Sequence, residues 1–484
     1  MNFRILGKFL SKVLLIEAIF MIPALLISTF QGEMDSVLGF AASICIILLL
    51  SFLLGFATKG GMRSYFAKEG LMCVGISWLA LSVMGCFPFW ISGGIPSFID
   101  ALFETVSGFT TTGSSILSEV ESLPMGLLYW RSFTHWIGGM GVLVFVLALG
   151  TGSEGKTGFT MHVLRAESPG PSVGKLVPKM KSTAEILYGI YLALTVIDII
   201  FLLAGGMPLF DAVCTAFGTA GTGGFGIRND SIAGYSPYIQ NVCTVFMLLF
   251  GVNFTCYYML LIRQVKSIYR DEELRAYLGI VFASIVLIVW NLKDFYGSFE
   301  ETVRHAAFQV SSIMTTTGFA TTDFDQWPSF SKAILFALMM IGASAGSTGG
   351  GFKVGRLLLI LKSIRRNVRQ VMNPKKVQVV KMNGAMVGEK VLENSNAYLA
   401  VYAMIIGASF LVISLDGFSI TTNLSAVVAC FNNIGPGFEM VGATGNFGAY
   451  SVLSKLVLIL DMLAGRLEIF PILILFSKSA WKNK

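Results

Sequence analysis

The chain has 484 residues, of which 54% are hydrophobic and 13% are charged. Because soluble domains carry about 25% charged residues, this composition excludes an ordinary soluble globular protein. The formal net charge is +7, from 35 basic and 28 acidic residues, and its distribution along the chain matters more than its size.

Eleven apolar runs follow one another along the chain, and each is predicted to span or help to span a bilayer, which needs about 20 residues per helix. No small-residue cleavage site follows the first run, and Glu17 interrupts it, so we interpret it as an uncleaved first span. These features predict an all-α polytopic membrane protein. The runs are residues 13–30, 37–57, 71–91, 125–149, 186–204, 242–262, 277–290, 333–341, 357–361, 397–415 and 453–476.

Lys and Arg gather in alternate gaps between these runs, which by positive-inside logic places those gaps and both termini in the cytoplasm. A nucleic-acid partner is not expected, because the charges lie where membrane topology requires them. The basic segment at residues 365–376 is suited to contact anionic lipid or a cytosolic partner. The basic gaps are residues 4–12, 59–68, 156–181, 263–275, 353–390 and 478–484, and the acidic ones are residues 33–35, 100–104, 119–121, 323–325 and 416.

Four stretches follow one plan: a turn residue, a short amphipathic run, a segment of Thr, Gly and Asn, and then another membrane helix. The amphipathic runs are too short to cross a bilayer, and non-helical backbone survives at membrane depth only inside protein or beside a watery cavity. We therefore predict four quasi-repeated units of helix, pore helix, filter and helix around one central pore. The stretches are residues 96–115, 208–225, 297–320 and 417–438. Aligning their glycines places Gly113, Gly223, Gly318 and Gly435 at equivalent positions.

The spacing of these glycines divides the chain into five parts. Two leading spans occupy residues 1–68. The four pore units are residues 69–155, 156–268, 269–380 and 381–484, and the third unit includes a glycine-rich intramembrane loop.

The tetrapeptide Thr-Thr-Thr-Gly occurs at residues 110–113 and again at residues 315–318. Backbone carbonyl oxygens can replace the hydration shell of a cation, glycine permits the dihedral angles that aim them, and threonine adds a hydroxyl oxygen. The C-terminal dipole end of each short helix favours a cation as well. The alternative is that these small residues serve close helix packing. The candidate cation-binding residues are Thr111, Thr112, Gly113, Gly221, Thr222, Gly223, Thr316, Thr317, Gly318, Asn433, Ile434 and Gly435.

At the motifs FTTTGS, GTGGFG, MTTTGFAT and NNIGPGFE the chain resembles the Trk/Ktr/HKT superfamily of potassium transporters, and the likeness covers essentially its whole length. The two leading spans favour the Trk type, because Ktr-type subunits start directly with the first repeat. The resemblance implies one selectivity glycine per filter segment, with K⁺ and Rb⁺ preferred over Na⁺, K⁺ bound in the filter as the transported ion, and no organic cofactor. The fourth repeat departs from the pattern with Asn432 and Asn433, so backbone carbonyls would dominate there.

The resemblance also implies a lipid-embedded homodimer in the inner membrane of a bacterial cell, with a cytosolic nucleotide-binding regulatory subunit of the TrkA type. Coupling to Na⁺ or H⁺ (symport) is left open. The competing class is an ion-coupled secondary transporter of an organic solute that uses broken helices. An enzyme is not expected. Residues 221–226 match the dinucleotide-binding pattern GxGxxG, but no βαβ unit surrounds them. Residues 346–353 resemble a P-loop but lack its Gly-Lys-Ser/Thr end.

Five of the ten residues from 342 to 351 are glycine, too many for a stable helix interior at about 1 kcal/mol each relative to alanine. We predict that the helix unwinds there. The resemblance implies an intramembrane loop that obstructs the pore and moves to open it, and the alternative is a plain bend or a close-packing stretch. The candidate gate residues are Gly342, Ala343, Ser344, Ala345, Gly346, Ser347, Thr348, Gly349, Gly350 and Gly351.

Arg466 falls inside the last apolar run, where an unpaired arginine is costly and usually functional. The resemblance implies that it faces the pore beneath the filter and forms a barrier to cations. The alternative is a structural ion pair with Asp461, Glu468 or an acid on another helix.

The remaining polar and sulfur-bearing residues are given structural interpretations. Arg131, beside Trp130 and Trp136, is interpreted as an interfacial anchor. We expect ordinary polar contacts for His135 and His305. His162 is expected in a cytoplasmic loop, and the seven cysteines are interpreted as small core residues without disulfide or metal spacing.

Overall fold

The structure is a computed structural model, and it describes residues 3–58, 67–141 and 180–481. Within these residues the chain is almost entirely helical, which confirms the predicted all-α class. The cytoplasmic position of His162 and the unit boundary at residues 155–156 lie outside the described residues.

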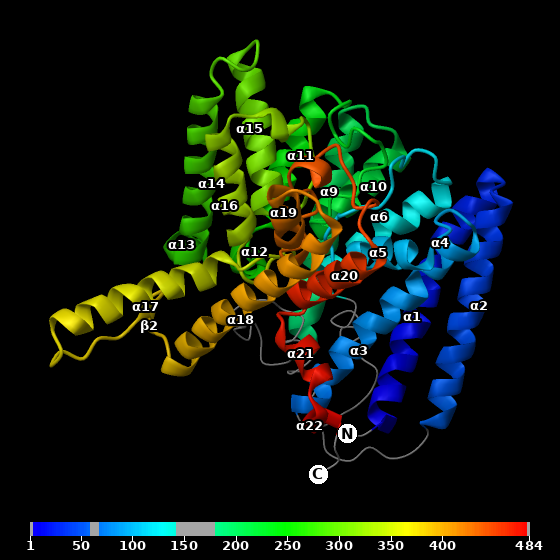
Figure 1. Ribbon diagram of the computed structural model, residues 1–484, viewed down its shortest axis with the longest axis horizontal. Helices are drawn as coiled ribbons and strands as arrows, with labels where there is room; N and C mark the ends of the chain where they lie inside the picture. The colour runs from blue at the N-terminus through cyan, green and yellow to red at the C-terminus, as the bar shows by residue number, and fades with distance from the viewer. Residues whose placement is uncertain (1–2, 59–66, 142–179, 482–484) are drawn as a thin grey trace.

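Two leading helices, α1 (Phe3–Gln31) and α2 (Met34–Ala57), lie side by side at one edge of the molecule (Figure 1). The hydroxyl groups of Ser11 and Ser51 each donate to the backbone carbonyl of the other residue at 2.7 Å. Because lipid offers no hydrogen bonds, such reciprocal bonds hold polar groups at a helix interface.

The rest of the chain forms four groups in which a long helix precedes a short one. The first group comprises α3 (Ala67–Gly85), α4 (Phe87–Ile91), α5 (Phe98–Phe109) and α6 (Met125–Met140). The second comprises α9 (Met180–Ala204), α10 (Leu209–Gly221), α11 (Pro237–Phe250), α12 (Phe254–Leu261) and α13 (Val265–Arg270). The third comprises α14 (Glu272–Asn291), α15 (Phe299–Met314), η1 (Phe324–Gln326), α16 (Ser329–Ile341), α17 (Val354–Met372), β1 (Lys381–Met382) and β2 (Ala385–Met386). The fourth comprises α18 (Glu389–Ile413), η2 (Ser414–Asp416), α19 (Ile420–Phe431), η3 (Glu439–Val441), α20 (Val452–Arg466), α21 (Phe470–Phe476) and α22 (Lys478–Trp481).

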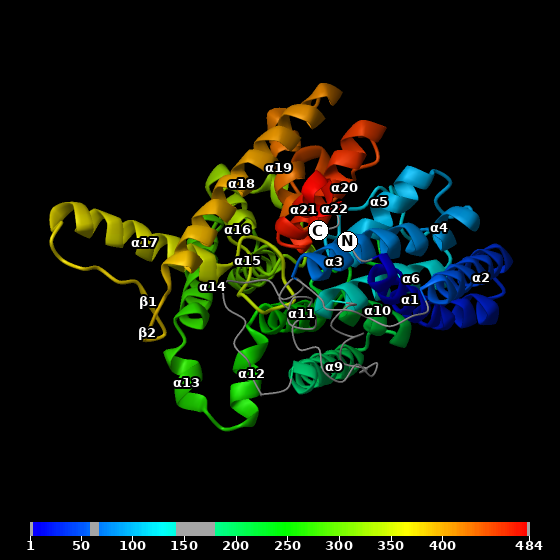
Figure 2. The same cartoon turned by 90° about the horizontal axis from the view of Figure 1, so that it is seen from below.

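The four groups surround a common centre in chain order, as Figure 2 shows. Each group packs on the next: α6 contacts α10, α11 contacts α15, α16 contacts α19, and α20 returns to contact α5. This closed order brings the short helices α5, α10, α15 and α19 toward one another.

The short helices have 12 to 16 residues, so at about 1.5 Å per residue they cannot cross the bilayer core of about 30 Å. Three of them begin at a serine cap. The hydroxyl oxygens of Ser97, Ser298 and Ser419 accept the amide hydrogen of the residue three positions on, at 3.4, 3.1 and 3.0 Å. The fourth, α10, begins after Pro208, whose fixed backbone suits a helix start.

Six helices in the described part of the chain are long and apolar enough to cross a membrane by length and composition. They match the predicted runs that begin at residues 13, 37, 71, 186, 277 and 397. The predicted run at residues 242–262 is instead broken, because α11 and α12 meet at an angle of 88°.

Two further runs are also interrupted. The run predicted at residues 453–476 divides into α20 and α21 at Glu468 and Ile469, whose φ angles are 60° and 65°. The run at residues 125–149 begins as α6, which ends at Met140, and its part from residue 142 lies outside the described residues. Six of the seven cysteines are buried as predicted, but Cys45 on α2 is exposed.

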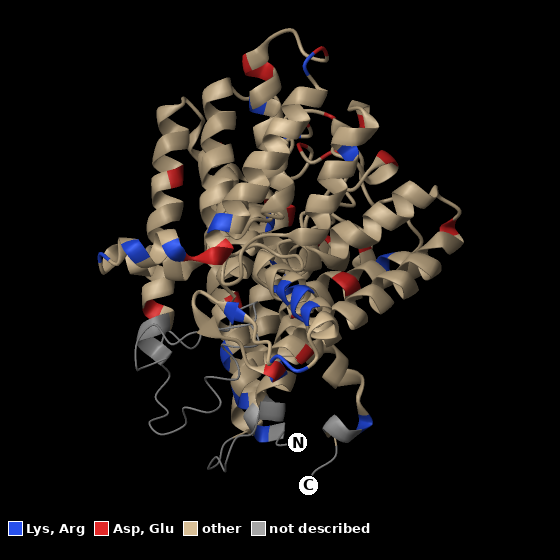
Figure 3. Cartoon of the chain, turned by 90° about the vertical axis from the view of Figure 1, so that its left-hand side faces the viewer, with Lys and Arg blue, Asp and Glu red and all other residues tan. Residues whose placement is uncertain are grey.

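Helix α1 begins and helix α22 ends at the same end of the molecule (Figure 1), and many of the Lys and Arg residues are in the half toward it (Figure 3). Helix α17 projects from the body in Figures 1 and 2, and the hairpin of β1 and β2 returns along it. Glu272, at the start of α14, pairs with Lys362 on α17, and its other oxygen accepts the amide of Asn383 at the hairpin turn. The carboxylate therefore joins the projecting arm to the helix bundle.

Candidate functional site

The four loops that follow the short helices meet in a closed ring. We name them loop 1 (residues 110–115), loop 2 (221–226), loop 3 (315–320) and loop 4 (432–437). In each loop one glycine lies so near the next loop that an added β-carbon would collide with, or press against, a carbonyl oxygen there. The pairs are Gly113 with Gly223, Gly224 with Thr317, Gly318 with Ile434, and Gly435 with Thr112. Since the fourth loop returns to the first, the loops enclose one axis.

Each loop has the same unusual backbone. Two residues before the ring glycine, a non-glycine residue adopts a left-handed conformation that L-residues rarely occupy. The repetition of this strained position in all four loops indicates one common loop geometry, of the kind that clusters at functional sites. These residues are Thr111, Thr222, Thr316 and Asn433, with φ of 54°, 53°, 59° and 55°, and the ring glycines Gly113, Gly224, Gly318 and Gly435 have φ of 83°, 77°, 90° and 103°.

The predicted alignment of loop 2 is wrong by one residue. Positive φ occurs at Gly224 and not at Gly223, so Gly224 is the equivalent of Gly113. The amide of Gly223 donates to the carbonyl five residues back at 2.8 Å, and the amides of Thr112 and Thr317 make the same bond at the same distance. The predicted set of Gly221, Thr222 and Gly223 therefore becomes Thr222, Gly223 and Gly224.

A sequence signal for this correction exists. Loop 2 contains the dipeptide Gly224–Phe225, and loop 3 contains Gly318–Phe319. Aligning the Gly-Phe pairs, and not the first available glycine, gives the register that the structure shows.

The threonine hydroxyls of the loops are largely engaged within the protein. The Thr110 and Thr112 hydroxyl oxygens lie 2.7 Å apart, as do those of Thr315 and Thr317, and the Thr222 hydroxyl donates to the Gly221 carbonyl at 2.6 Å. Hydroxyl groups in these bonds hold the shape of loops 1, 2 and 3.

The carbonyl oxygens just before the ring glycines are free of such bonds. In the part of the chain that the structure describes, no backbone or side-chain donor bonds to them, although their residues are buried. A buried carbonyl without a partner is costly, so these oxygens require water or a cation. They belong to Thr112, Gly223, Thr317 and Ile434.

A glycine-rich loop, defined here as residues 342–353 between α16 and α17, packs against the ring. The amide of Gly350 donates to the hydroxyl oxygen of Thr316 at 2.6 Å. A β-carbon on Gly349 would lie 2.8 Å from the Thr315 carbonyl oxygen, and one on Gly350 would overlap that of Asn432. The predicted unwinding of the helix is confirmed, and the unwound segment meets the bases of loops 3 and 4.

Two polar anchors hold the glycine-rich loop. The Glu273 carboxylate accepts the amides of Ala345 at 2.6 Å and of Gly355 at 3.0 Å. One oxygen therefore joins the glycine-rich loop to the start of α17. The Ser344 amide donates to a carbonyl at the end of α11 at 3.1 Å. Sequence reasoning missed Glu273, because an acid in the first turn of a helix ordinarily indicates only favourable placement at the helix dipole.

Arg466 lies where the glycine-rich loop, loop 1 and the end of α6 meet. Its guanidinium donates to the carbonyl oxygens of Thr348 at 2.8 Å, Gly138 at 2.5 Å and Gly139 at 2.8 Å. It also donates to the hydroxyl of Thr111 at 3.2 Å. The side chain is therefore held directly at the ring, with its charge beside loop 1.

Two acids near Arg466 in the sequence, Asp461 and Glu468, are engaged with other residues. Glu468 forms an ion pair with Arg356 on α17. Asp461 accepts a hydrogen bond from the Ser409 hydroxyl at 2.8 Å.

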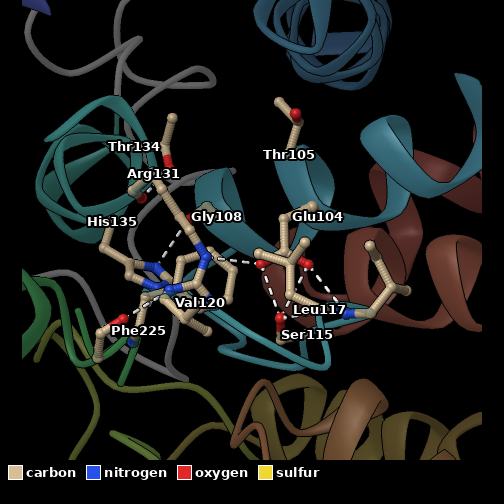
Figure 4. Close-up of polar contacts among 12 residues, drawn as sticks. Glu104, Thr105, Gly108, Ser115, Leu117, Val120, Arg131, Thr134, His135 and Phe225 are labelled. Carbon is tan, nitrogen blue, oxygen red and sulfur yellow. Dashed lines mark hydrogen bonds and ion pairs between the residues drawn. The ribbon is translucent and has the colours of Figure 1, made fainter. Parts of the chain in front are cut away.

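The interpretation of Arg131 as an interfacial anchor is wrong. Only 3% of its surface is exposed, and its Nε donates to Glu104 at 2.6 Å (Figure 4). Its guanidinium also donates to the Gly226 carbonyl at 2.8 Å and lies over the Phe225 ring, 3.5 Å from the centroid. The charge is thus satisfied inside the protein, beside loop 2.

The two described histidines differ in their surroundings. His305 makes an ordinary polar contact with the Thr321 hydroxyl at 2.9 Å, as predicted. His135 instead joins two elements: its Nδ1 lies 2.9 Å from the Gly108 carbonyl, and its Nε2 lies 3.3 Å from the Phe225 amide (Figure 4).

Comparison with known proteins gives a consistent result. The family described as TrkH, cation transport protein, matches residues 37–483. Over the full length of both chains, the sequence is 34% identical to the Trk system potassium uptake protein TrkH of Escherichia coli (strain K12). It is 33% identical to TrkG of the same strain, over 96% of this chain and 95% of that one. The crystal structure of the potassium transporter TrkH from Vibrio parahaemolyticus matches all of both chains with a TM-score of 0.89 and 30% identity.

Proposed function

This chain belongs to the TrkH family of cation transport proteins, and from that membership we propose that it takes up K⁺ across the inner membrane of a bacterial cell. The relatives named above are potassium uptake proteins of Trk systems and a potassium transporter. In this proposal K⁺ is the cargo, and it passes along the axis that the four loops enclose.

The observation that carries this proposal is the set of four buried carbonyl oxygens, one from each loop, to which no donor among the described residues bonds. Rings of backbone carbonyls replace the hydration shell of K⁺ in selective pores. Because each oxygen comes from a different quarter of the chain, only the folded bundle brings the four together. We propose that the filter comprises Thr111, Thr112, Gly113, Thr222, Gly223, Gly224, Thr316, Thr317, Gly318, Asn433, Ile434 and Gly435.

Glycine at all four ring positions supports selection of K⁺ and Rb⁺ over Na⁺. A side chain at any of these positions would displace the carbonyl of the neighbouring loop. Selection by a ring of carbonyls depends on the number and placement of the oxygens, so a displaced oxygen would weaken it.

We propose the glycine-rich loop as the gate and Arg466 as an electrostatic barrier beside it. The loop packs on loops 3 and 4, and Arg466 joins it to loop 1 through the carbonyl of Thr348. Movement of the loop would therefore also release Arg466 from one of its acceptors. Residues 342–351 form the moving segment in this proposal.

A cytosolic nucleotide-binding subunit of the TrkA type is the proposed regulator, and a homodimer is the proposed assembly. The projecting arm of α17 and its hairpin is one place where a partner could act, because Glu272 joins the arm to α14, the helix whose Glu273 holds the gate loop. Both termini are cytoplasmic in this topology. The proposed five-part division is residues 1–68, 69–155, 156–268, 269–380 and 381–484, with one boundary inside α13 and another just before β1, so it differs slightly from the four helix groups described above.

Uptake of ⁸⁶Rb⁺ into proteoliposomes tests the function. We expect uptake that unlabelled K⁺ competes for strongly and Na⁺ weakly, since the carbonyl ring fits the larger ion better. Empty liposomes are the control. Absence of Rb⁺ uptake, or uptake that depends on an added organic solute, would favour a secondary transporter over the pore.

Replacing Arg466 by glutamine is expected to raise basal Rb⁺ uptake about tenfold to thirtyfold. A unit charge about 8 Å from a passing cation, at an effective dielectric constant of about 20, raises its energy by about 2 kcal/mol. Glutamine removes that charge and retains some hydrogen-bonding capacity. The measurement is initial ⁸⁶Rb⁺ uptake at matched protein density.

Arg466→Lys is the matched control, because lysine keeps the charge but loses the planar fork of donors. If the barrier is electrostatic, basal uptake in Arg466→Lys stays near the wild-type level. Equal increases in both variants would instead assign the effect to the lost hydrogen bonds, and an unchanged rate in Arg466→Gln would refute the barrier.

A further inference from the structure

Loop 2 differs from the other three loops in how it is held. Of its residues 221–226, four are glycine, so the backbone has more freedom and fewer side chains to fix it. The one hydroxyl it contains, on Thr222, bonds within the loop to Gly221. Loops 1 and 3 hold themselves with paired threonines, and in loop 4 the Asn433 amide donates to the Met462 carbonyl at 2.9 Å. Loop 2 therefore requires support from outside its own sequence.

Helix α6 of the first group supplies that support. Arg131 and His135 are four residues apart and so lie on one face of the helix, directed at loop 2 (Figure 4). Arg131 donates to the Gly226 carbonyl at 2.8 Å, and His135 Nε2 accepts the Phe225 amide at 3.3 Å. A β-carbon on Gly223 would overlap the His135 ring, so the ring lies directly against the loop backbone.

Glu104 connects the same support to loop 1. Its carboxylate accepts Nε of Arg131 at 2.6 Å, the Ser115 hydroxyl at 2.9 Å and the Ile116 amide at 3.0 Å. Glu104 and Arg131 are buried, so these three hydrogen bonds, one of which is the ion pair, must offset the loss of hydration of both charges. His135 completes the link, because its Nδ1 donates to the Gly108 carbonyl on α5, which leaves Nε2 as the acceptor for loop 2.

The acid of this connection occurs at its position in the first unit and is replaced in the other three. Glu104 lies nine residues before its ring glycine (113 − 104 = 9). The residues at the same offset in the other units are Thr215, Gln309 and Ala426, from 224 − 9, 318 − 9 and 435 − 9. None of them is charged, so a buried ion pair at this place is a property of the contact between the first two loops.

We propose that Glu104, Arg131 and His135, here named the Glu104 network, are positioning residues that hold loop 2 against loop 1 and thereby set the preference for K⁺ over Na⁺. In this proposal none of the three side chains is a ligand of the ion. They act through the carbonyl of Gly223, whose placement in the ring depends on the backbone of loop 2. The selectivity part of this inference rests on the proposed function, and the positioning part does not.

The experiment compares the wild type with Glu104→Gln, Arg131→Gln and the double variant E104Q/R131Q. The double variant leaves no unpaired buried charge, so it separates loss of positioning from the cost of an isolated ion. Arg228→Gln is the matched control: it removes the same charge two residues after Gly226, where Arg228 pairs with Asp211 at 3.5 Å and is 40% exposed.

Two measurements are made on each protein. Amide hydrogen exchange of peptides that cover loop 2 and loop 3 reports on positioning without any need for transport. We expect exchange in loop 2 of E104Q/R131Q to rise about tenfold while loop 3 stays unchanged. Competition of K⁺ and Na⁺ for ⁸⁶Rb⁺ uptake should show a fall in K⁺ preference of about tenfold, because small misplacements of interacting groups have effects of up to about 100-fold in catalytic sites.

Wild-type exchange in loop 2 of E104Q/R131Q would overturn the positioning role. Altered exchange with wild-type ion preference would overturn the role in selectivity. If the wild type itself shows no Rb⁺ uptake, the proposed function fails, while the exchange data still decide whether the network holds loop 2. Should E104Q/R131Q elute as aggregate, Arg131→Lys replaces it, since a lysine ammonium cannot bridge Glu104 and the Gly226 carbonyl as the guanidinium does.

Discussion

Gly224→Ser and Gly318→Ser are each expected to reduce the preference for K⁺ over Na⁺ at least about tenfold. Both glycines have positive φ, 77° and 90°, where a residue with a β-carbon is strained by about 1–3 kcal/mol. The added β-carbon would also overlap the carbonyl oxygens of Thr317 and Ile434, two of the four proposed ligands. The strain and the overlap together displace oxygens of the ring, and about 1.4 kcal/mol of lost discrimination corresponds to tenfold. Competition of K⁺ and Na⁺ for ⁸⁶Rb⁺ uptake measures the result.

Gly407→Ser is the matched control for these variants. Gly407 is an exposed residue of α18 with helical geometry, and a β-carbon there would meet no atom within 4 Å. It should transport like the wild type. Normal selectivity in Gly224→Ser together with lost selectivity in Gly318→Ser would show that loop 2 does not contribute a ring glycine at this position.

The positions of the helices could be predicted well from the sequence, because hydrophobic length is a direct physical requirement of the bilayer. Six predicted runs coincide with candidate membrane spans in the described part of the chain, although the span at Gly70–Ile91 is made of α3 and α4. The broken helices were predicted only where glycine made the break visible, at residues 342–351. The break between α20 and α21 depends on positive φ at Glu468 and Ile469, residue types that give no local signal for such a backbone.

The sequence predicted that four loops meet, with Gly113, Gly318 and Gly435 at equivalent positions, but the register of loop 2 was wrong by one residue. Glycine after each of four short helices, with threonine after three of them, indicated a ring, since glycine permits the backbone that aims carbonyl oxygens inward. The shift from Gly223 to Gly224 was missed because loop 2 has two adjacent glycines, and composition alone cannot choose between them. The Gly-Phe pair shared with loop 3 does distinguish the two choices.

The supporting residues were not predicted because their partners are distant in sequence. Arg131 lies next to Trp130 in a helix, which is typical of an interfacial anchor, but its carboxylate partner is 27 residues earlier. Glu273 is 72 residues before Ala345, the first amide that it binds. Such pairs are fixed by the tertiary fold, so a hydropathy or motif pattern in one sequence cannot reveal them.

Deleting residues 347–350 of the glycine-rich loop is expected to raise basal Rb⁺ uptake about tenfold or more. The deletion removes the Gly350 amide that bonds Thr316 and the Thr348 carbonyl that bonds Arg466. Each buried hydrogen bond contributes about 0.5–1.5 kcal/mol, so losing two favours the open position by about 1–3 kcal/mol, and tenfold corresponds to about 1.4 kcal/mol. Initial ⁸⁶Rb⁺ uptake without any regulatory subunit measures the change.

Glu273→Gln tests the same gate without shortening the chain. One Glu273 oxygen accepts the amides of both Ala345 and Gly355, and a neutral amide oxygen accepts such bonds more weakly than a carboxylate. Basal uptake should therefore rise in this variant as well, by less than in the deletion. Gly388→Ala, a substitution into open space before α18, is the matched control. A gate held shut by these contacts requires both variants to leak; uptake at or below the wild-type rate in correctly folded protein would mean that the loop supports the pore and does not close it.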